Sequence, residues 1–443
     1  MNLFLAGAEA ERVIAELPAA RDSSFKDLKS KLKDFSRSIG IEVIGVTHAS
    51  PFMRLDDVLR ERDRDGYRSP FEERDVGLRC DPGRVMPGAR SIIAIAVPYA
   101  TSAGPGAAPF AGNAGKPGFD AQNPEQETSQ DPRGRPRGRI SMSSWGRDYH
   151  VVVGSILQQL SDFLTQNSPR PVRLASFVDT GQLVDRAIAW RAGIGWYGKN
   201  CSIFTRKYGS WVFLGEILTD LELEPDTPWA GAGSPEPAAG ERYEGGEDGC
   251  GDCDICLRAC PTGALDPRRP YVTNANICLS YITQVRGFVP RDMRTKMGFR
   301  LYGCDTCQEV CPRNERVAPA GLDAFRPRSR DDVAPDLLDV LTMSNSRFKE
   351  VYGLTAAGWR GRTVLQRNAV IALGNLRDDH GIDVAIPILK ACLDDPRPVI
   401  RGHAAWSLGT VGGTRGRRYL EDRYRREDDA RVKEEIVAAL DQS

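Results

Sequence analysis

The sequence predicts a multidomain protein of mixed α/β and α class, with an α/β domain, a cysteine-rich domain and an all-α domain. Three observations predict this fold. Helical and strand patterns alternate from about residue 25 to 225, eight cysteines crowd between Cys250 and Cys311, and one helical pattern recurs toward the C-terminus. The 443 residues suffice for roughly three domains. We expect these domains at residues 1–225, 226–325 and 326–443.

Composition narrows the functional classes. The 60 basic and 60 acidic residues cancel, so a nucleic-acid surface has to be a local patch. The opening residues "MNLFLAGAEAERVIAELPAARD" lack a basic leader, and no apolar stretch reaches the ~20 residues of a membrane span. Eleven cysteines in such a chain favour metal over disulfides in a reducing compartment, so we expect a cytoplasmic protein.

The N-terminal domain shows an ordered series of helices and strands. Helical periodicity covers residues 24–40 and ends on Gly40, and residues 148–167 form a long amphipathic helix. Buried strands are expected at residues 41–47, 91–100, 172–180 and 210–219. Two Gly- and Pro-rich segments interrupt the series, a mobile insertion at 101–138 and a loop at 225–249. The series predicts an α/β domain.

The motif "CGDCDICLRACP" indicates the chemistry of the middle domain. Its cysteines follow C-x2-C-x2-C-x3-C-P, in which three thiolates wrap one cuboidal cluster and the fourth reaches a second, as in bacterial ferredoxins. Zinc sites usually separate two short cysteine pairs by a longer loop, so structural zinc is the weaker alternative. A ferredoxin-like domain then requires further cysteines downstream.

A second cysteine run meets that requirement. "YGCDTCQEVCP" supplies three cysteines, Leu301 stands where a symmetric ferredoxin has its first ligand, and Cys278 is the one cysteine between the runs. We assign one [4Fe–4S] cluster to Cys250, Cys253, Cys256 and Cys311. The other cluster takes Cys260, Cys278, Cys304 and Cys307. The isolated Cys80, Cys201 and Cys392 are expected to be small buried hydrophobic residues.

The C-terminal third is repetitive. "RNAVIALGNL" from Arg367 recurs as "RGHAAWSLGTV" from Arg401, a period of 34 residues, and "RVKEEIVAAL" from Arg431 is a more degenerate copy. Second helices, "VAIPILKACLDD" and "RRYLEDRYRR", lie between the copies. Helix pairs near this period indicate a short HEAT-type solenoid. Such an array is usually a binding surface, and a stabilising cap is the alternative.

The α/β domain should hold the redox centre that the clusters reduce, but it lacks two familiar fingerprints. No G-x-G-x-x-G follows a strand, which argues against a Rossmann-type nicotinamide site. "DYHVVVG" approaches the D-x-H-x-x-G pattern of a histidine-ligated corrinoid, but its glycine, Gly154, comes one residue late.

Motifs spread from about Phe71 to Leu408 carry a family resemblance. They are "SPFEERDVGLRCDP", "GRDYHVVV", "FVDTGQLVDRAIAWRAGIGWYGKN", "GSWVFLGEILTDL", "YGCDTCQEVCPRN", and "RNAVIALGN" followed by "RGHAAWSLG". Together they resemble the epoxyqueuosine reductases, cobalamin-dependent iron–sulfur enzymes that perform the last step of queuosine synthesis in tRNA. The displaced Cys278 also fits that family. Reductive dehalogenases share the corrinoid and the two clusters but lack the repeats.

The resemblance implies a reaction and an acid for it. Reduced cobalamin acts on the epoxide-bearing ring of epoxyqueuosine at the tRNA wobble position, the ring opens, and loss of water leaves an alkene. Two electrons enter through the clusters, and a general acid has to protonate the departing oxygen. Asp179 of "FVDTG" matches the family's proton donor. The alternative is that Asp179 or Thr180 caps the helix that follows.

The resemblance also supplies candidate cobalamin contacts. Asp305 and Thr306 lie between two cluster ligands, so their backbone should face whatever the second cluster reduces. Arg79 of "RCDP" and Tyr149 of "DYH" are further candidates, with a surface salt bridge and a core tyrosine as the respective alternatives. His150 is interpreted as an exposed helix residue. The glycine-rich "RAGIGWYGKN" suits close approach to a bulky cofactor, or a plain turn.

One stretch departs from the family pattern. Family members commonly carry an Arg-Tyr pair just before "GRDYH", where this chain has Met142 and Ser143. If those side chains line the corrinoid or substrate pocket, this protein lines it differently.

Two basic stretches support a tRNA partner. Clustered arginines with aromatic residues suit phosphate contacts and base stacking, and proteins read single-stranded loops such as the anticodon loop. Intruding acidic residues leave a solvated face as the alternative for each stretch. The first consists of Arg286, Arg291, Arg294, Lys296 and Arg300. The second consists of Arg415, Arg417, Arg418, Arg423, Arg425 and Arg426, with Tyr419 and Tyr424.

Two other functional classes stay open. A corrinoid reductase of a small molecule, like a reductive dehalogenase, would not bind a tRNA stem-loop in a salt-dependent way. A ferredoxin-like electron carrier would show no cobalamin absorbance. The favoured interpretation is a monomeric oxidoreductase without membrane contact, which takes electrons from a reductase, a flavodoxin or a ferredoxin.

Overall fold

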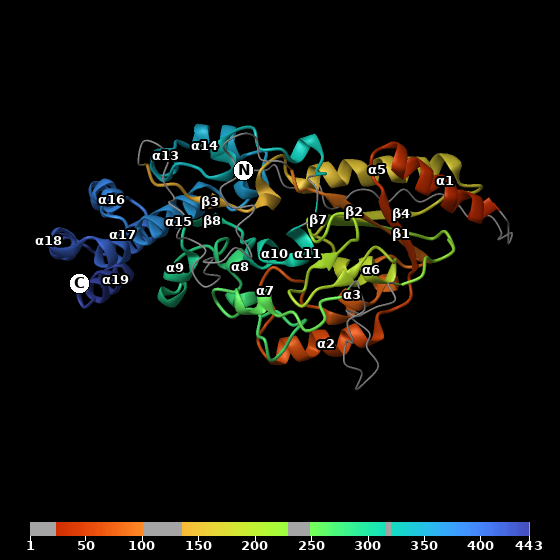
Figure 1. The fold of residues 1–443 in the computed structure, drawn as a ribbon, viewed down its shortest axis with the longest axis horizontal. Coiled ribbons are helices and arrows are strands. Elements are labelled where there is room, and N and C mark those ends of the chain that lie inside the picture. The colour runs from red at the N-terminus through yellow and green to blue at the C-terminus, as the bar shows by residue number, and fades with distance from the viewer. Residues whose placement is uncertain (1–23, 102–134, 229–248, 316, 318–319, 443) are drawn as a thin grey trace. The chain divides into compact units, whose positions relative to one another are not determined.

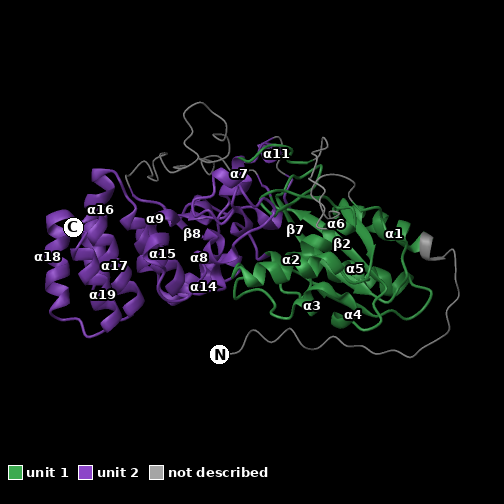
Figure 2. Cartoon of the chain, turned by 90° about the horizontal axis from the view of Figure 1, so that it is seen from below, with its two compact units in different colours: residues 1–99, 149–254 green, residues 100–148, 255–443 purple. Residues whose placement is uncertain are grey.

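The computed structural model describes residues 24–101, 135–228, 249–315, 317 and 320–442 (Figure 1). Its backbone contacts divide the chain into unit 1, residues 1–99 with 149–254, and unit 2, residues 100–148 with 255–443 (Figure 2). Most of the predicted insertion and of the predicted loop, and the opening residues expected to lack a leader, lie outside the described residues. The division into three domains stays a prediction.

Unit 1 contains a four-stranded sheet that is antiparallel throughout. In sheet order its strands are β1 (Val43–His48), β2 (Ser91–Pro98), β7 (Val212–Thr219) and β4 (Leu174–Phe177). All four expected strands are present. β2 is buried along its whole length because it lies in the interior of the sheet. The expectation of a buried strand at 172–180 was wrong, because β4 is an edge strand that pairs with β7 alone and stays partly exposed.

Helices cover both faces of this sheet (Figure 1). On one face α5 (Tyr149–Asn167) packs on β7 and β4 and against α1 (Ser24–Ser38). On the other face α6 (Asp185–Arg191) packs on β1, β2 and β7. Side chains alternate along β7, so Gly215 faces α5 whereas Glu216 faces α6. As the sequence predicts, a glycine follows the first helix, since Gly40 adopts a φ of 84°.

Shorter elements complete unit 1. They are α2 (Met53–Arg64), α3 (Val76–Cys80), α4 (Pro82–Val85) and the small hairpin of β5 (Trp196–Tyr197) and β6 (Ile203–Phe204). The thiols of Cys80 and Cys201 are buried, as expected, and burial raises the pKa of Cys80 to about 11. Such thiols are unreactive packing groups.

The first half of unit 2 is made of short elements around the cysteine runs. A parallel pair joins β3 (Arg139–Ile140) to β8 (Arg300–Tyr302). The helices are α7 (Ile255–Arg258), α8 (Leu279–Ile282), α9 (Arg291–Met297), α10 (Thr306–Glu309), α11 (Pro312–Glu315), α12 (Arg330–Val333), α13 (Leu337–Thr342) and α14 (Asn345–Tyr352). Brief 3-10 turns occur at Met142–Ser144, Ala275–Ile277, Asp323–Phe325 and Ala356–Gly358.

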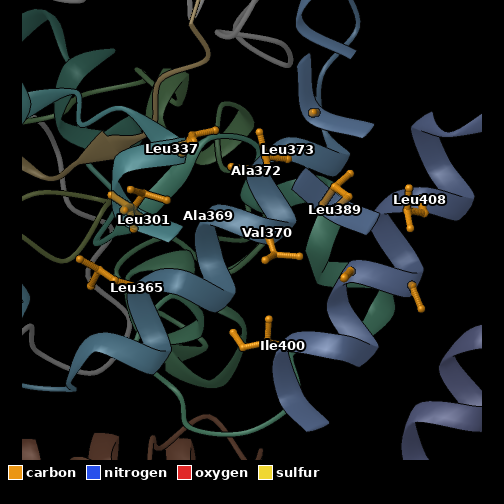
Figure 3. Packing of buried hydrophobic residues seen from close by; sticks show 14 of the residues in the cluster. Leu301, Leu337, Leu365, Ala369, Val370, Ala372, Leu373, Leu389, Ile400 and Leu408 are labelled. Carbon is orange, nitrogen blue, oxygen red and sulfur yellow. The ribbon is translucent and has the colours of Figure 1, made fainter. Parts of the chain in front are cut away.

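The predicted helical repeats are confirmed. First helices are α15 (Arg362–Gly374), α17 (Pro398–Val411) and α19 (Ala430–Leu440), and they pack in sequence against one another. Second helices are α16 (Asp379–Cys392) and α18 (Gly413–Tyr424). Leu301 of β8 and Leu337 of α13 share one core with these helices (Figure 3). Burying each such leucine contributes roughly 1.5–3 kcal/mol.

Polar side chains of α15 hold the backbone of the preceding segment. Asn368 is fully buried and donates to the carbonyl oxygens of Thr283 and Leu301, both at 2.7 Å. The guanidinium of Arg367 donates to the carbonyl oxygens of Val285 and Gly287. The first repeat helix therefore satisfies backbone groups in the stretch between Cys278 and Cys304.

Within the described ranges, none of the helices combines the length and the hydropathy that a bilayer crossing requires.

Candidate active site

Asp179 lies in the tight turn that follows β4. Its φ of 56° falls in the left-handed region, which aspartate tolerates better than most residues and which is frequent at functional positions. Its side chain is 64% exposed. The helix-cap alternative was wrong, because the N-cap of α6 is Val184 and not Asp179 or Thr180. The carboxyl of Asp179 is thus presented outward by a constrained backbone.

Two residues at the start of α5 surround this carboxyl. The Tyr149 hydroxyl donates to Asp179 Oδ2 at 2.5 Å, and His150 Nε2 lies 3.8 Å from the same oxygen. The Tyr149 ring stacks on Phe213, with ring centroids 4.4 Å apart, and on His150 at 4.1 Å. Tyr149 is therefore not a core tyrosine. The sequence analysis interpreted His150 only as an exposed helix residue. The signal for its place in the site was its position next to Tyr149 in "DYH".

Two carboxyl groups behind Asp179 were missed. Glu216 on β7 is 1% exposed, and its carboxyl is hydrogen-bonded to that of half-buried Asp185, the first residue of α6. Burial and the neighbouring Asp179 charge raise the pKa of Asp185 to about 6. Burial and Asp185 raise the pKa of Glu216 well above its ordinary range. An acidic residue inside the apolar strand "VFLGEILT" was the signal for this pair.

The alternative prediction for Arg79 was a surface salt bridge. Arg79 does form a salt bridge, but the side chain is buried, so the predicted surface position is wrong. Its Nη1 lies 2.9 Å from Glu72 Oε2. Burial disfavours the charged form of Glu72, yet the hydrogen bonds and charges of Arg62 and Arg79 outweigh it and lower the pKa of Glu72 to about 2. The Arg79 guanidinium is thus already engaged in a buried ion pair, and its contact with cobalamin stays a prediction.

Asp305 and Thr306 lie in unit 2 at the start of α10, and both are buried. Asp305 accepts hydrogen bonds from Ser141 Oγ at 2.5 Å and from the Met142 N–H at 2.8 Å. The Thr306 hydroxyl accepts from Arg300 at 2.8 Å and from Cys304 Sγ at 3.4 Å. The Asp305 carbonyl oxygen also accepts from the N–H groups of Gln308 and Glu309, both at 2.9 Å, and its contact with cobalamin stays a prediction. The departure from the family pattern at Met142 therefore adjoins a candidate contact.

The glycines of "RAGIGWYGKN" serve the protein's own packing. A Cβ on Gly195 would lie 2.1 Å from the Phe204 carbonyl oxygen, and one on Gly198 would lie 2.4 Å from the Phe204 ring. Gly193, with a φ of 73°, is similarly close to the carbonyl oxygen of Thr227. These three positions require glycine because protein backbone and rings fill the space, so the structure does not support cofactor approach there.

Several cysteines of unit 2 are near enough to influence one another's pKa. Cys304 and Cys260 act electrostatically on Cys278, and burial, followed by Cys304, raises the pKa of Cys278 to about 12. The same three thiols act on Cys307, as does Cys256, which the prediction assigns to the other cluster. No three His, Cys, Asp or Glu side chains of the described residues converge on a single metal ion. A cuboidal cluster instead takes one thiolate at each of four irons, and this donor set fits it.

The remaining predicted cluster ligands divide between the units. Cys256 and Cys311 are buried in unit 2. Cys250 and Cys253 belong to unit 1, where the Lys199 backbone N–H donates to Cys250 Sγ at 3.4 Å. None of the eleven cysteines, all of them among the described residues, forms a disulfide. Cys392 is half-buried against the repeat core, which agrees in part with its predicted role.

The prediction that the first basic stretch contacts tRNA was partly wrong. Arg294 is completely buried and pairs with Glu435 at 2.8 Å, and Arg300 is 3% exposed and bonded to Thr306. Arg291 also pairs with Glu435. Arg294 and Arg300 therefore stabilise unit 2 and are not available to phosphates, whereas Arg286, Arg291 and Lys296 are exposed. Five arginines of the second stretch are exposed: Arg415, Arg417, Arg418, Arg425 and Arg426.

Family comparisons agree with this architecture. Residues 79–180 match the model described as "Epoxyqueuosine reductase QueG, DUF1730". Residues 249–314 match a "4Fe-4S double cluster binding domain", and residues 361–441 match HEAT repeats. The cysteine-rich segment thus holds two [4Fe–4S] clusters, and the α-solenoid is of the HEAT type.

Whole-chain comparisons extend the match to nearly the full length. The chain is 39% identical to the epoxyqueuosine reductases of Bacillus cereus and of Bacillus subtilis, covering 94% of this chain and 98% and 95% of those relatives. A solved epoxyqueuosine reductase bound to an epoxyqueuosine-modified tRNA-Tyr stem loop is 39% identical, with a TM-score of 0.79 and coverage of 94% of this chain and 98% of that one. With such identity along almost its entire length, this chain belongs to the epoxyqueuosine reductase family of oxidoreductases.

Proposed function

We propose that this protein reduces the epoxide of epoxyqueuosine at the wobble position of tRNA, giving queuosine, with Asp179 as the proton donor. The observation that carries the assignment of the acid is the exposed Asp179 carboxyl, held at 2.5 Å by the Tyr149 hydroxyl. The solved relative with a modified stem loop supports the substrate class. An acid that reaches a substrate from a constrained turn can protonate a leaving oxygen without reorganising.

The reaction has a simple balance. The epoxide oxygen leaves as water, the two carbons that held it become an alkene, and two electrons and two protons are consumed. Asp179 supplies a proton to the departing oxygen. Tyr149 orients the carboxyl through its hydroxyl, and His150, 3.8 Å from the same carboxylate oxygen, is placed to return a proton to it.

Cobalamin is the second cofactor, because this family is cobalamin-dependent. Gln182 Oε1, three residues after Asp179, is buried without a hydrogen-bond partner among the described residues, and it suits the amide groups on the rim of a corrin ring. With it we assign Arg79, Tyr149, Asp179, Asp305 and Thr306 as contacts. Bound cobalamin supplies a cobalt centre reducing enough to open the epoxide.

The clusters deliver the electrons. Cys250, Cys253, Cys256 and Cys311 hold one cluster in this proposal, and Cys260, Cys278, Cys304 and Cys307 hold the other. The enzyme works as a cytoplasmic monomer and takes electrons from a low-potential one-electron carrier, such as a flavodoxin or ferredoxin.

One assay tests the proposal. The protein is reconstituted anaerobically with iron and sulfide, then incubated with cobalamin, a chemical reductant and an anticodon stem-loop bearing epoxyqueuosine. Mass spectrometry of the nucleosides should show loss of one oxygen from that base, only when cobalamin is present. No conversion by fully loaded protein would refute the proposed substrate and direct the search to small-molecule substrates.

A further inference from the structure

A lysine beside the first cysteine run makes an unusual set of contacts within unit 1. Lys199 lies in the turn between β5 and β6, and its side chain is half-buried. Its ammonium donates to the carbonyl oxygens of Gly251 at 2.6 Å and Cys253 at 2.9 Å. Its backbone N–H donates to Cys250 Sγ at 3.4 Å. One residue thus binds both a ligand sulfur and the backbone of the ligand loop.

These contacts fix the shape of the loop that carries two ligands. Gly251 has a φ of 48°, and the Cys253 N–H donates to the Cys250 carbonyl oxygen at 3.0 Å, which closes a turn. The outward carbonyls of that turn would otherwise bind water. Lys199 replaces water there with a fixed positive charge.

A fixed charge at this place has an electronic effect as well as a mechanical one. Reduction of a cluster adds one negative charge, and a cation nearby stabilises the reduced form. Hydrogen bonds to a ligand sulfur act in the same direction, since both are established means of tuning cluster potentials. The side chain is only partly exposed, so solvent screens this charge incompletely.

The second cysteine group in unit 2 has a different environment. Cys304 Sγ donates to the Thr306 hydroxyl at 3.4 Å, and the Thr262 hydroxyl lies 3.7 Å from Cys260 Sγ. Both of these groups are neutral hydroxyls, although the buried Arg300 guanidinium donates to the Thr306 hydroxyl at 2.8 Å. The two predicted clusters therefore differ, because a lysine ammonium donates directly to the backbone of the loop that carries Cys250 and Cys253.

We propose that Lys199 is a positioning residue that raises the reduction potential of the cluster bound by Cys250 and Cys253, and so makes that cluster the acceptor of electrons from the external donor. The proposal rests on the cluster assignment of the proposed function and adds a residue that sets the order of electron transfer.

The test is an EPR-monitored redox titration of the anaerobically reconstituted protein. Lys199→Gln keeps an N–H donor for the loop carbonyls and removes the charge, and Lys199→Arg keeps the charge. Lys207→Gln is the matched control, because Lys207 is an exposed lysine of unit 1 that pairs with Glu42. A Cys250→Ala variant identifies which signal belongs to the first cluster.

With Lys199→Gln we expect one cluster to titrate at a more negative potential and the other to stay unchanged. Lys199→Arg should restore most of the original potential. At a fixed potential near the wild-type midpoint, the reduced fraction of the first cluster should fall several-fold. Conversion of the stem-loop should slow with a flavodoxin-type donor, and it should keep its rate with excess chemical reductant.

Unchanged midpoints of both clusters in fully loaded Lys199→Gln protein would overturn the proposal. So would equal potentials of the Gln and Arg variants, because the effect would then be mechanical and not electrostatic. If Lys199→Gln fails to bind iron, the Arg variant alone decides, since its midpoint has to stay near that of the wild type. The titration needs no substrate, so failure of the proposed tRNA reaction is recognised separately in wild-type protein.

Discussion

The hydroxyl of Tyr149 and the carboxyl of Asp179 lie 2.5 Å apart, although they are thirty residues apart in the chain. Tyr149 begins α5, and Asp179 lies in the turn after β4. Removing the acid with Asp179→Asn should lower the rate of epoxide reduction by roughly 10²–10⁴-fold, the usual contribution of a general acid. The measurement is single-turnover conversion of a modified stem-loop. An Asp179→Asn protein with the wild-type rate would exclude Asp179 as the acid.

Tyr149→Phe should have a smaller effect than loss of the acid. The hydrogen bond to a charged acceptor is worth about 1.5–3 kcal/mol, so a decrease of roughly ten- to a hundredfold in turnover is expected. Cobalamin binding, followed by absorbance, checks whether Tyr149 also contacts the cofactor. Tyr67→Phe, just after α2 in the same unit, is the control, and its rate should equal that of the wild type.

Glu216→Gln should stabilise the protein at neutral and alkaline pH. A carboxyl whose folded pKa is raised contributes stability at pH below its unfolded value, here 3.8 for Asp185, and loses that contribution as pH rises through about 6. Burial and Asp185 also raise the pKa of Glu216 well above 4.5, so ionising it in the folded protein is costly. The glutamine removes that cost, so the free energy of unfolding should rise by about 1–3 kcal/mol at pH 8. Thermal unfolding from pH 4 to pH 8 measures this. Glu222→Gln, at an exposed carboxylate of the same unit, should leave the profile unchanged.

The buried pair of Arg294 and Glu435 should be important for the stability of unit 2. Arg294→Met leaves a buried carboxylate without its closest partner and should cost about 3–5 kcal/mol. Arg291→Met is the matched control, because Arg291 is 40% exposed and pairs with the same carboxylate, and its loss should cost about 1 kcal/mol or less. Denaturant unfolding compares the two variants, and equal costs would contradict the assigned burial.

Acid should weaken the same pair. Charged partners, chiefly the hydrogen bonds from Arg294, lower the pKa of Glu435 from 4.5 despite its burial. Its stabilising contribution is therefore present above pH 4.5 and is lost as pH falls through the lowered folded value. Glu435→Gln should flatten this acid limb of the stability profile.

Iron analysis tests the displaced ligand. Cys278→Ala should remove one cluster and leave about half of the iron, because each [4Fe–4S] cluster needs its own ligand set. Cys392→Ala, at a half-buried thiol outside both cysteine runs, should keep the full content. Full iron in Cys278→Ala would mean that another group completes the second cluster.

Exposed arginines of α18 and its C-cap residue Arg425 should contribute to tRNA affinity. Arg415, Arg417 and Arg425 have side chains 56%, 47% and 74% exposed, although each also pairs with a nearby acid. Their combined replacement by glutamine should weaken stem-loop binding. The slope of log affinity against log salt concentration should become shallower, by the equivalent of up to about three phosphate contacts. Binding titrations at several salt concentrations measure the slope. An unchanged slope would leave α18 as a solvated face.

The sequence predicted those parts of the protein whose pattern is itself the physical cause. The repeat helices, the strand segments and the cysteine spacings follow from periodicity and ligand geometry, so they could be predicted directly, whereas the antiparallel pairing of the strands was not predicted. Which arginines face solvent could not, because Arg294 and Arg291 are three residues apart on one helix and differ completely in burial. The carboxyl pair of Asp185 and Glu216 could not be predicted for a related reason. Its partners meet only when α6 packs on the central part of β7.

The hydrogen bonds of Asn368 have a consequence for how this protein can be taken apart. The two carbonyl oxygens that it binds, those of Thr283 and Leu301, lie near the two ends of the stretch of chain between Cys278 and Cys304. In a truncated chain that ends before α15, both acceptors and the apolar face of β8 would be left uncovered. The ferredoxin-like segment is therefore not a portable module. A gene fusion or a minimal variant that keeps the second cluster has to carry the first repeat helix with it.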